Sequence, residues 1–159
     1  MAAREPLATD RHDVDWIRKI TMLVGAVFLL VGVLGFIPGI TTDYSDLAFA
    51  GHGSNAKLIG IFEVSVLHNI VHLLFGVAGL AAARTARTAA TYLVGGGVVY
   101  LVVWIYGLLV GQESSANLIP LNTADNWLHF LLAVGMIALG AVAMRALRGP
   151  ATGRAPTLG

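Results

Sequence analysis

The chain has 159 residues, 57% hydrophobic and 12% charged, with a formal net charge of +1 and no cysteine. A mean hydropathy of +0.77 is too apolar for a water-exposed surface and indicates an integral membrane protein, with the lipid bilayer as its main contact and no nucleic-acid partner. The missing cysteines exclude disulfides, iron–sulfur clusters, thiolate zinc sites and c-type haem attachment. Any metal would have to bind to His, Asp or Glu.

Apolar segments long enough to cross a membrane occur four times. A hydrocarbon core of roughly 30 Å needs about 20 apolar residues per helix. The predicted spans are residues 17–36, 62–83, 91–110 and 126–146. They form one all-α transmembrane domain over residues 17–147, and we expect residues 1–16 and 148–159 to be disordered tails.

Basic residues concentrate in the N-terminal tail, the link between the second and third spans, and the C-terminal tail. They are Arg4, Arg11, Arg18, Lys19, Arg84, Arg87, Arg145, Arg148 and Arg154. By the positive-inside rule, these three regions are cytoplasmic. The sequence therefore predicts a multi-pass protein of the cell (plasma) membrane with both termini inside.

The connections between the spans differ in length. The outer loop, residues 40–61, is the longest and is polar enough to lie across the outer mouth of the domain. Residues 57–66 alternate weakly between polar and apolar, which fits either a short strand or an interfacial helix. The cytoplasmic link at residues 84–88 is so short that the second and third spans must be antiparallel neighbours. Glycines at 95–97, 107 and 111 favour close helix packing.

A short polar pattern occurs twice, each time where a span begins on the outer side. Residues 67–73 read Leu-His-Asn-Ile-Val-His-Leu, and residues 124–130 read Ala-Asp-Asn-Trp-Leu-His-Phe. His68 thus matches Asp125, Asn69 matches Asn126, and His72 matches His129. The constant offset predicts two helical hairpins related by a pseudo-twofold axis along the membrane normal.

Polar side chains at membrane depth are costly and need a structural or functional reason. His68 and His72, like Asp125 and His129, are four residues apart and share one helix face. If the second and fourth helices meet, these four residues could bind a zinc-like divalent metal, or histidines from facing helices could hold haem b. Asn69 and Asn126 would then support the ligands or join the helices.

A structural interpretation of the same residues is favoured. His, Asn and Asp at the start of a span can cap the helix and form hydrogen bonds that clamp helices two and four together. The protein would then be a non-enzymatic structural or accessory subunit, acting with a membrane-protein partner or a second copy. A small transporter or channel is a third hypothesis, disfavoured because the inner halves of the spans offer few polar residues.

Residues 62–80, Phe-Glu-Val-Ser-Val-Leu-His-Asn-Ile-Val-His-Leu-Leu-Phe-Gly-Val-Ala-Gly-Leu, resemble the signature of DUF4383, an uncharacterised family of four-span membrane proteins found mainly in actinobacteria. Residues 125–129 resemble that family's second signature. Family members often have Asn-Pro where this chain has Ser65-Val66. The resemblance covers roughly residues 18–146 and implies an architecture but no activity. A looser likeness to small four-helix proteins of the DoxX type is analogy alone.

Overall fold

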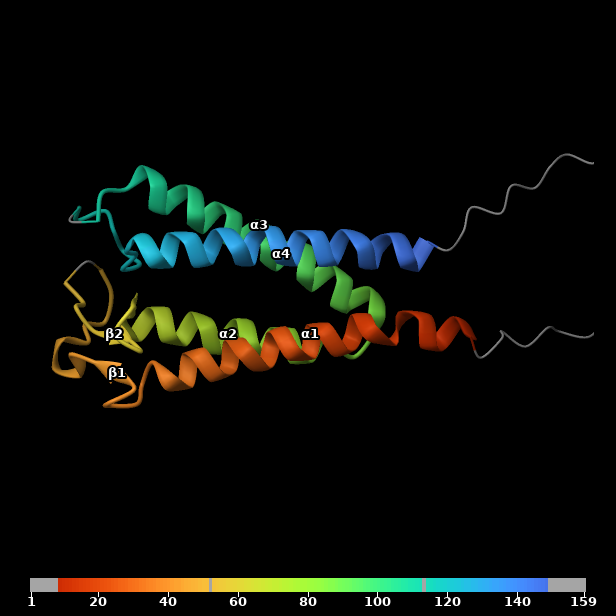
Figure 1. The fold of residues 1–159 in the computed structure, drawn as a ribbon, viewed down its shortest axis with the longest axis horizontal. Helices are drawn as coiled ribbons and strands as arrows, with labels where there is room; N and C mark the ends of the chain where they lie inside the picture. The colour runs from red at the N-terminus through yellow and green to blue at the C-terminus, as the bar shows by residue number, and fades with distance from the viewer. Residues whose placement is uncertain (1–8, 52, 113, 149–159) are drawn as a thin grey trace, which may run out of the picture.

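The computed structural model describes residues 9–51, 53–112 and 114–148. Within these residues, four helices carry most of the chain: α1 (Thr9–Leu34), α2 (Val66–Ala82), α3 (Ala86–Leu109) and α4 (Thr123–Arg148). They run roughly along one axis, and the start of α1 and the end of α4 lie at the same end of the molecule (Figure 1). The predicted helical fold class is confirmed at this level.

The helices pack as two hairpins, α1 against α2 and α3 against α4 (Figure 1). Glycines allow the close approach within each hairpin. A Cβ at Gly25 would lie 3.0 Å from the carbonyl O of Gly76, and a Cβ at Gly97 would lie 2.9 Å from the backbone N of Ile137. The two hairpins meet through a core of Phe28, Leu93, Tyr100, Ala133 and Met136.

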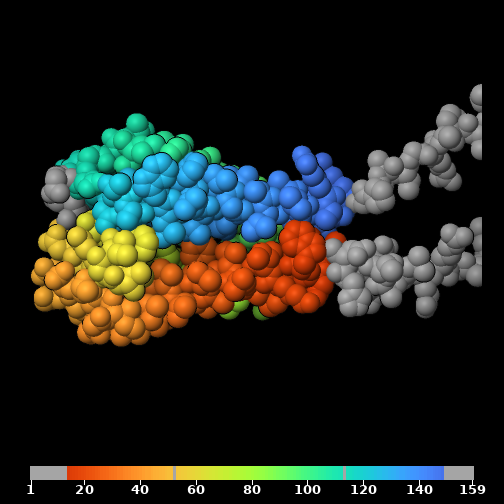
Figure 2. Space-filling view, viewed as in Figure 1, coloured from red at the N-terminus to blue at the C-terminus, as the bar shows by residue number. Residues whose placement is uncertain are grey.

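Three of the helices, over Val14–Leu34, Ala86–Leu109 and Thr123–Arg148, are long and apolar enough to cross a membrane, while α2 is apolar but has 17 residues. Large apolar side chains on their outer faces are exposed, among them Leu74 at 63% and Leu131 at 64%. Such a surface suits lipid rather than water. The space-filling view shows the face on which α1 and α4 adjoin (Figure 2).

The first helix begins earlier than the sequence suggested. We predicted a disordered tail over residues 1–16, which is wrong from Thr9 onward, since α1 starts there. Two short ion pairs stabilise its first turns, from Asp15 to Arg18 at 3.4 Å and to Lys19 at 3.0 Å. Ile17 is fully buried against alanines of α3 and α4. Residues 1–8 and 149–159 of the predicted tails lie outside the described residues.

The other predicted helix limits also shift. The second span was expected from residue 62, but α2 starts at Val66, where the Ser65 Oγ accepts a hydrogen bond from the backbone N of His68 at 3.1 Å. The third span was expected from residue 91, but α3 starts at Ala86 behind the equivalent cap of Thr85. In both cases an N-cap hydroxyl determines where the helix begins, whereas the prediction used only the number of consecutive apolar residues.

The connection between α1 and α2 forms a small sheet, which answers whether residues 57–66 form a strand or an interfacial helix. Strands β1 (Thr41–Thr42), β2 (Lys57–Leu58) and β3 (Phe62–Glu63) pair antiparallel in the order β1-β2-β3. A 3-10 turn, η1 (Tyr44–Asp46), follows β1. Buried Ala56, Leu58 and Val64 pack against α1 residues, so the sheet sits on the end of the first hairpin.

Candidate functional site

A group of polar side chains is buried near the sheet end of the helices. We call His68, Asn69, His72, Asp125 and His129 the polar cluster. Each is between 1% and 7% exposed. The first three come from the start of α2 and the last two from the start of α4. The structure therefore brings the sequence-predicted residues into one region of the molecule.

The three histidines lie close together, but they do not converge on a point. The rings of His68 and His72 stack, with centroids 4.6 Å apart and planes inclined by 25°. The His72 Nδ1 lies 3.0 Å from the carbonyl O of His68. Because a carbonyl accepts only, this Nδ1 carries the proton. The ring centroids of His68 and His129 are 6.1 Å apart, so the facing sides of α2 and α4 approach each other through these side chains.

Two aromatic rings complete the layer at the level of the histidines. Phe28 of α1 lies 5.7 Å from the His72 ring, and Tyr100 of α3 lies 5.3 Å from the His129 ring. Phe28 and Tyr100 stack on each other at 5.3 Å with planes only 15° apart. One ring from each of the four helices thus fills the centre, and Phe28 was a participant that the sequence reasoning did not single out.

Asp125 binds backbone groups of two separate segments. Its Oδ2 accepts hydrogen bonds from the backbone N of Glu63 at 3.0 Å and of Asn122 at 3.1 Å. The Asn122 Oδ1 accepts in return from the backbone N of Asp125 at 3.0 Å. This reciprocal pair is a capping box at the start of α4. The carboxylate therefore joins strand β3 of the first hairpin to the first turn of the last helix.

Asn122 strengthens the same junction and was missed by the sequence reasoning. Its Nδ2 donates to the carbonyl O of Ile61 at 2.7 Å, which adds a second link between the α1–α2 connection and α4. An Asn three residues before an Asp at a helix start is a recognisable capping signal. That signal was available in the sequence, whereas the partners Ile61 and Glu63 were not.

Asn69 and Asn126 each lie against a glycine near the end of the preceding helix. A Cβ at Gly35 would overlap the Asn69 side chain, and a Cβ at Gly107 would overlap that of Asn126. The Asn126 Nδ2 donates to the Gly107 carbonyl O at 3.1 Å. Asn126 thus joins the two helices of its own hairpin by a hydrogen bond, and Asn69 packs against Gly35 within the other hairpin. Neither contact joins α2 to α4, which is where the sequence placed the clamp.

The predicted metal ligands do not form a coordination group. Among the described residues, no three His, Asp or Glu side chains are placed to hold a metal ion. The Asp125 Oδ2 is bound to two backbone N–H groups, and the stacked His68 and His72 rings face each other rather than a shared point. A haem does not fit either, because the stacked Phe28 and Tyr100 rings occupy the centre between the hairpins.

Cavities adjoin the polar cluster on two sides. One of about 190 Å³ lies toward the sheet and touches Asp125, His68 and His129. Another of about 90 Å³ lies between α2 and α3 and is lined by the three histidines, Tyr100 and apolar side chains. The Nδ1 atoms of His68 and His129 are buried without a hydrogen-bond partner among the described residues.

The fold and the cluster together define a class: a helical protein with membrane-compatible helices and a buried polar layer near one end. Comparison with known families makes this specific. Residues 18–142 match the family model described as a domain of unknown function, DUF4383, and the chain belongs to that family. No curated protein and no solved structure matches it.

Proposed function

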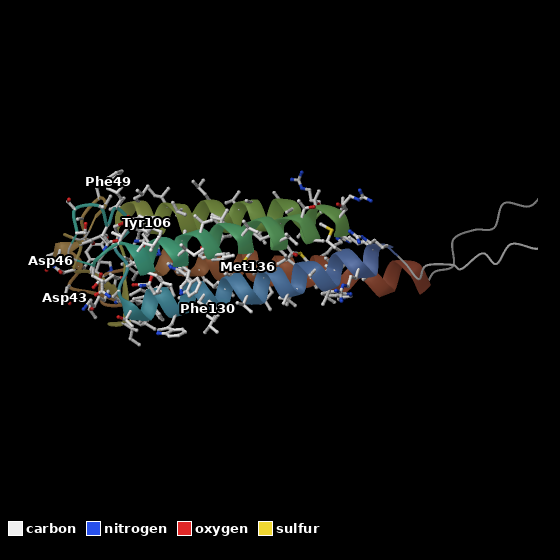
Figure 3. All side chains as sticks on the ribbon, turned by 90° about the horizontal axis from the view of Figure 1, so that it is seen from above. Asp43, Asp46, Phe49, Tyr106, Phe130 and Met136 are labelled. Atoms are coloured by element: carbon white, nitrogen blue, oxygen red, sulfur yellow. The ribbon has the colours of Figure 1, made fainter. Side chains whose placement is uncertain are left out.

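We propose that this protein crosses the plasma membrane four times, with both termini in the cytoplasm. Arginines gather where α1 begins, where α2 meets α3 and where α4 ends, and Asp43 and Asp46 lie at the opposite end (Figure 3). A concentration of arginine is typical of cytoplasmic ends, so the end with Asp43 and Asp46 is assigned to the outside by its scarcity of basic residues. Helix α2 has 17 residues, about 25 Å at a rise of 1.5 Å per residue, which comes close to a bilayer core when the capping residues are added.

We infer further that the two hairpins are copies of one repeat. The offset that relates His72 to His129 also relates Ser65 to Asn122, the two N-caps. A second constant offset relates Phe28 to Tyr100 and Gly35 to Gly107. The paired contacts agree with both offsets, since Phe28 with His72 matches Tyr100 with His129, and Gly35 with Asn69 matches Gly107 with Asn126.

Within this frame, the protein acts as a non-enzymatic structural or accessory membrane protein, and the polar cluster is a clamp at its outer face. The observation that carries this proposal is that the Asp125 carboxylate accepts hydrogen bonds from the backbone N–H groups of both Glu63 and Asn122. An interhelical hydrogen bond stabilises a membrane protein by only about 0.6 kcal/mol. Several such bonds at one end would hold the two hairpins in register for a partner subunit or a second copy of the chain.

The topology can be tested by exploiting the lack of native cysteines. Single cysteines at Ser45 and Arg87 would be labelled in intact cells and in opened vesicles with a membrane-impermeant maleimide. We expect Ser45→Cys to react from outside and Arg87→Cys to react only after the vesicles are opened. The reverse pattern would overturn the orientation, and reaction of both from one side would overturn the four-span count.

The clamp can be separated from a ligand site with the purified full-length protein. We expect His72→Leu combined with His129→Leu to change the thermal unfolding temperature in detergent while elemental content and absorption spectrum stay those of the parent protein. About one metal per chain, or a haem Soret band, that disappears in the double variant would overturn the clamp and favour ligand binding.

A further inference from the structure

An apolar groove runs along the lipid-facing side of α2 and α3 and ends at the polar cluster. Its open part, about 330 Å³, is lined by Leu74, Phe75, Ala78, Tyr92, Gly96 and Val99. Phe75 and Val99 also line the 90 Å³ cavity beside the three histidines, so these two side chains form the shared boundary of the two spaces. A molecule dissolved in the membrane would reach the imidazoles sideways by passing between them.

The inner end of the groove has unused hydrogen-bonding capacity. His68 is 7% exposed and His129 is 3% exposed, and the Nδ1 of each has no partner among the described residues. In the open part of the groove, the Tyr92 hydroxyl is satisfied, because it donates to the Phe75 carbonyl O at 2.9 Å. Buried polar atoms without partners are uncommon and need an explanation. A ligand oxygen in the adjoining cavity would supply one.

The lining restricts what such a ligand can be. No Lys or Arg is among the residues lining the groove or the cavity, which disfavours a phosphate or carboxylate head group. Phe75 and Tyr100 offer flat faces, and an oxygen with two lone pairs could accept from two imidazoles. The long apolar groove suits a hydrocarbon tail. We propose that this groove binds an uncharged amphiphile of the quinone or quinol class, with its ring beside His68 and His129.

The matching groove between α1 and α4 provides an internal contrast. It measures about 260 Å³ and is lined by Val27, Phe28 and Leu132 among others, with His72 at its end. The His72 Nδ1 already bonds to the His68 carbonyl, and Phe28 stands where the α2–α3 groove has Tyr100. This second groove lacks an unpartnered imidazole, so we assign the ligand to the α2–α3 groove alone.

The test measures saturable binding of radiolabelled decylubiquinone, and of its quinol, to the full-length protein in detergent micelles. Decylbenzene, which has the tail without the oxygens, is the competitor control. We expect Val99→Trp to abolish binding by filling the groove, and the matched Val27→Trp to leave it unchanged. Both valines are close to half exposed, at 45% and 48%, so neither change disturbs the core. His68→Phe and His129→Phe should each weaken binding about three- to tenfold, as expected for one neutral hydrogen bond.

Absence of saturable binding by folded parent protein would overturn the inference, as would equal competition by decylbenzene or equal losses from Val99→Trp and Val27→Trp. Thermal unfolding identifies any variant that fails to fold. If a histidine variant fails to fold, Val99→Trp still tests the inference by itself. The inference rests on the proposed membrane placement. Cysteine labelling of the same preparation distinguishes the two failures, since a correct topology without binding would leave the proposed function standing.

Discussion

The two hairpins differ most where their second helix begins. In the first hairpin, α2 starts behind Ser65, and the third residue after this cap is His68, whose imidazole accepts no backbone hydrogen bond among the described residues. In the second hairpin, α4 starts behind Asn122, and the third residue after the cap is Asp125, which binds two backbone N–H groups. The same position thus holds an imidazole whose Nδ1 has no hydrogen-bond partner among the described residues in one hairpin, and a carboxylate whose Oδ2 accepts two hydrogen bonds in the other.

The connections explain this difference. The connection between α1 and α2 carries the three-stranded sheet, whose last strand, β3, lies beside the start of α4. The connection between α3 and α4 is anchored to α3 by the Tyr106 hydroxyl, which donates to the Ala116 carbonyl O and accepts from the backbone N of Leu118. It also contacts the first connection, since the backbone N of Gly51 donates to the Leu118 carbonyl O at 2.8 Å. The first hairpin therefore supplies a docking strand and the second supplies the side chains that bind it. Asp125 therefore serves assembly, whereas His68, at the equivalent position, remains available to the proposed ligand.

The largest effect is expected from removing the carboxylate that joins the hairpins. Asp125→Ala would leave the backbone N–H groups of Glu63 and Asn122 without an acceptor, and each such buried donor costs about 1–3 kcal/mol. We expect a loss of about 3 kcal/mol in unfolding free energy, measured by SDS titration in mixed micelles. Asp125→Asn keeps one oxygen in the place of Oδ2, which can still accept both hydrogen bonds, but as a neutral acceptor, and should lose only about 1 kcal/mol. Equal losses from both variants would contradict the role of these two hydrogen bonds.

The sequence located the polar cluster because its residue types are unusual inside apolar helices. His68, His72, Asp125 and His129 were all found by that criterion, and all are buried together. What they bind could not be predicted, because the partner of Asp125 is a backbone N–H of β3, far away along the chain and without a side-chain signal. The metal interpretation finds no support among the described residues for the same reason: helical spacing gives a shared face but not the direction of each polar atom.

The helix limits, too, were predictable from the sequence only in part. Apolar length identified every helix, but the starts of α2 and α3 depend on single caps, Ser65 and Thr85, that hydropathy does not weigh. Upstream of the predicted start of α1, Val14 and Trp16 pack against the cluster of Ile17 with alanines of α3 and α4, a tertiary contact. The strand pairing of Lys57 with Glu63 is likewise a matter of register that weak alternation leaves open.

A medium effect is expected at the glycines that face the asparagines. Gly107→Ala would place a methyl group on the Asn126 side chain, which must then leave its bond to the Gly107 carbonyl. Overpacking of this kind costs about 1–3 kcal/mol, and we expect about 2 kcal/mol in the SDS titration. Adding Asn126→Ala should restore most of the loss. The cycle of Gly35→Ala with Asn69→Ala is the matched test in the first hairpin, and additivity in either cycle would contradict the contact.

The smallest expected effect is the difference in stability between the alanine variants of the two asparagines. The Asn126 Nδ2 donates to the Gly107 carbonyl, whereas the Asn69 Nδ2 has no partner among the described residues, although both side chains lie against a glycine. Truncation to alanine removes similar packing in both hairpins, but only Asn126→Ala also removes a hydrogen bond, worth about 0.6 kcal/mol in a membrane. We therefore expect Asn126→Ala to be the more destabilising of the pair by roughly that amount, resolved by parallel SDS titrations. A larger loss from Asn69→Ala would mean that its amide has a partner in the membrane, and would bring the two hairpins closer to true equivalence than their contacts imply.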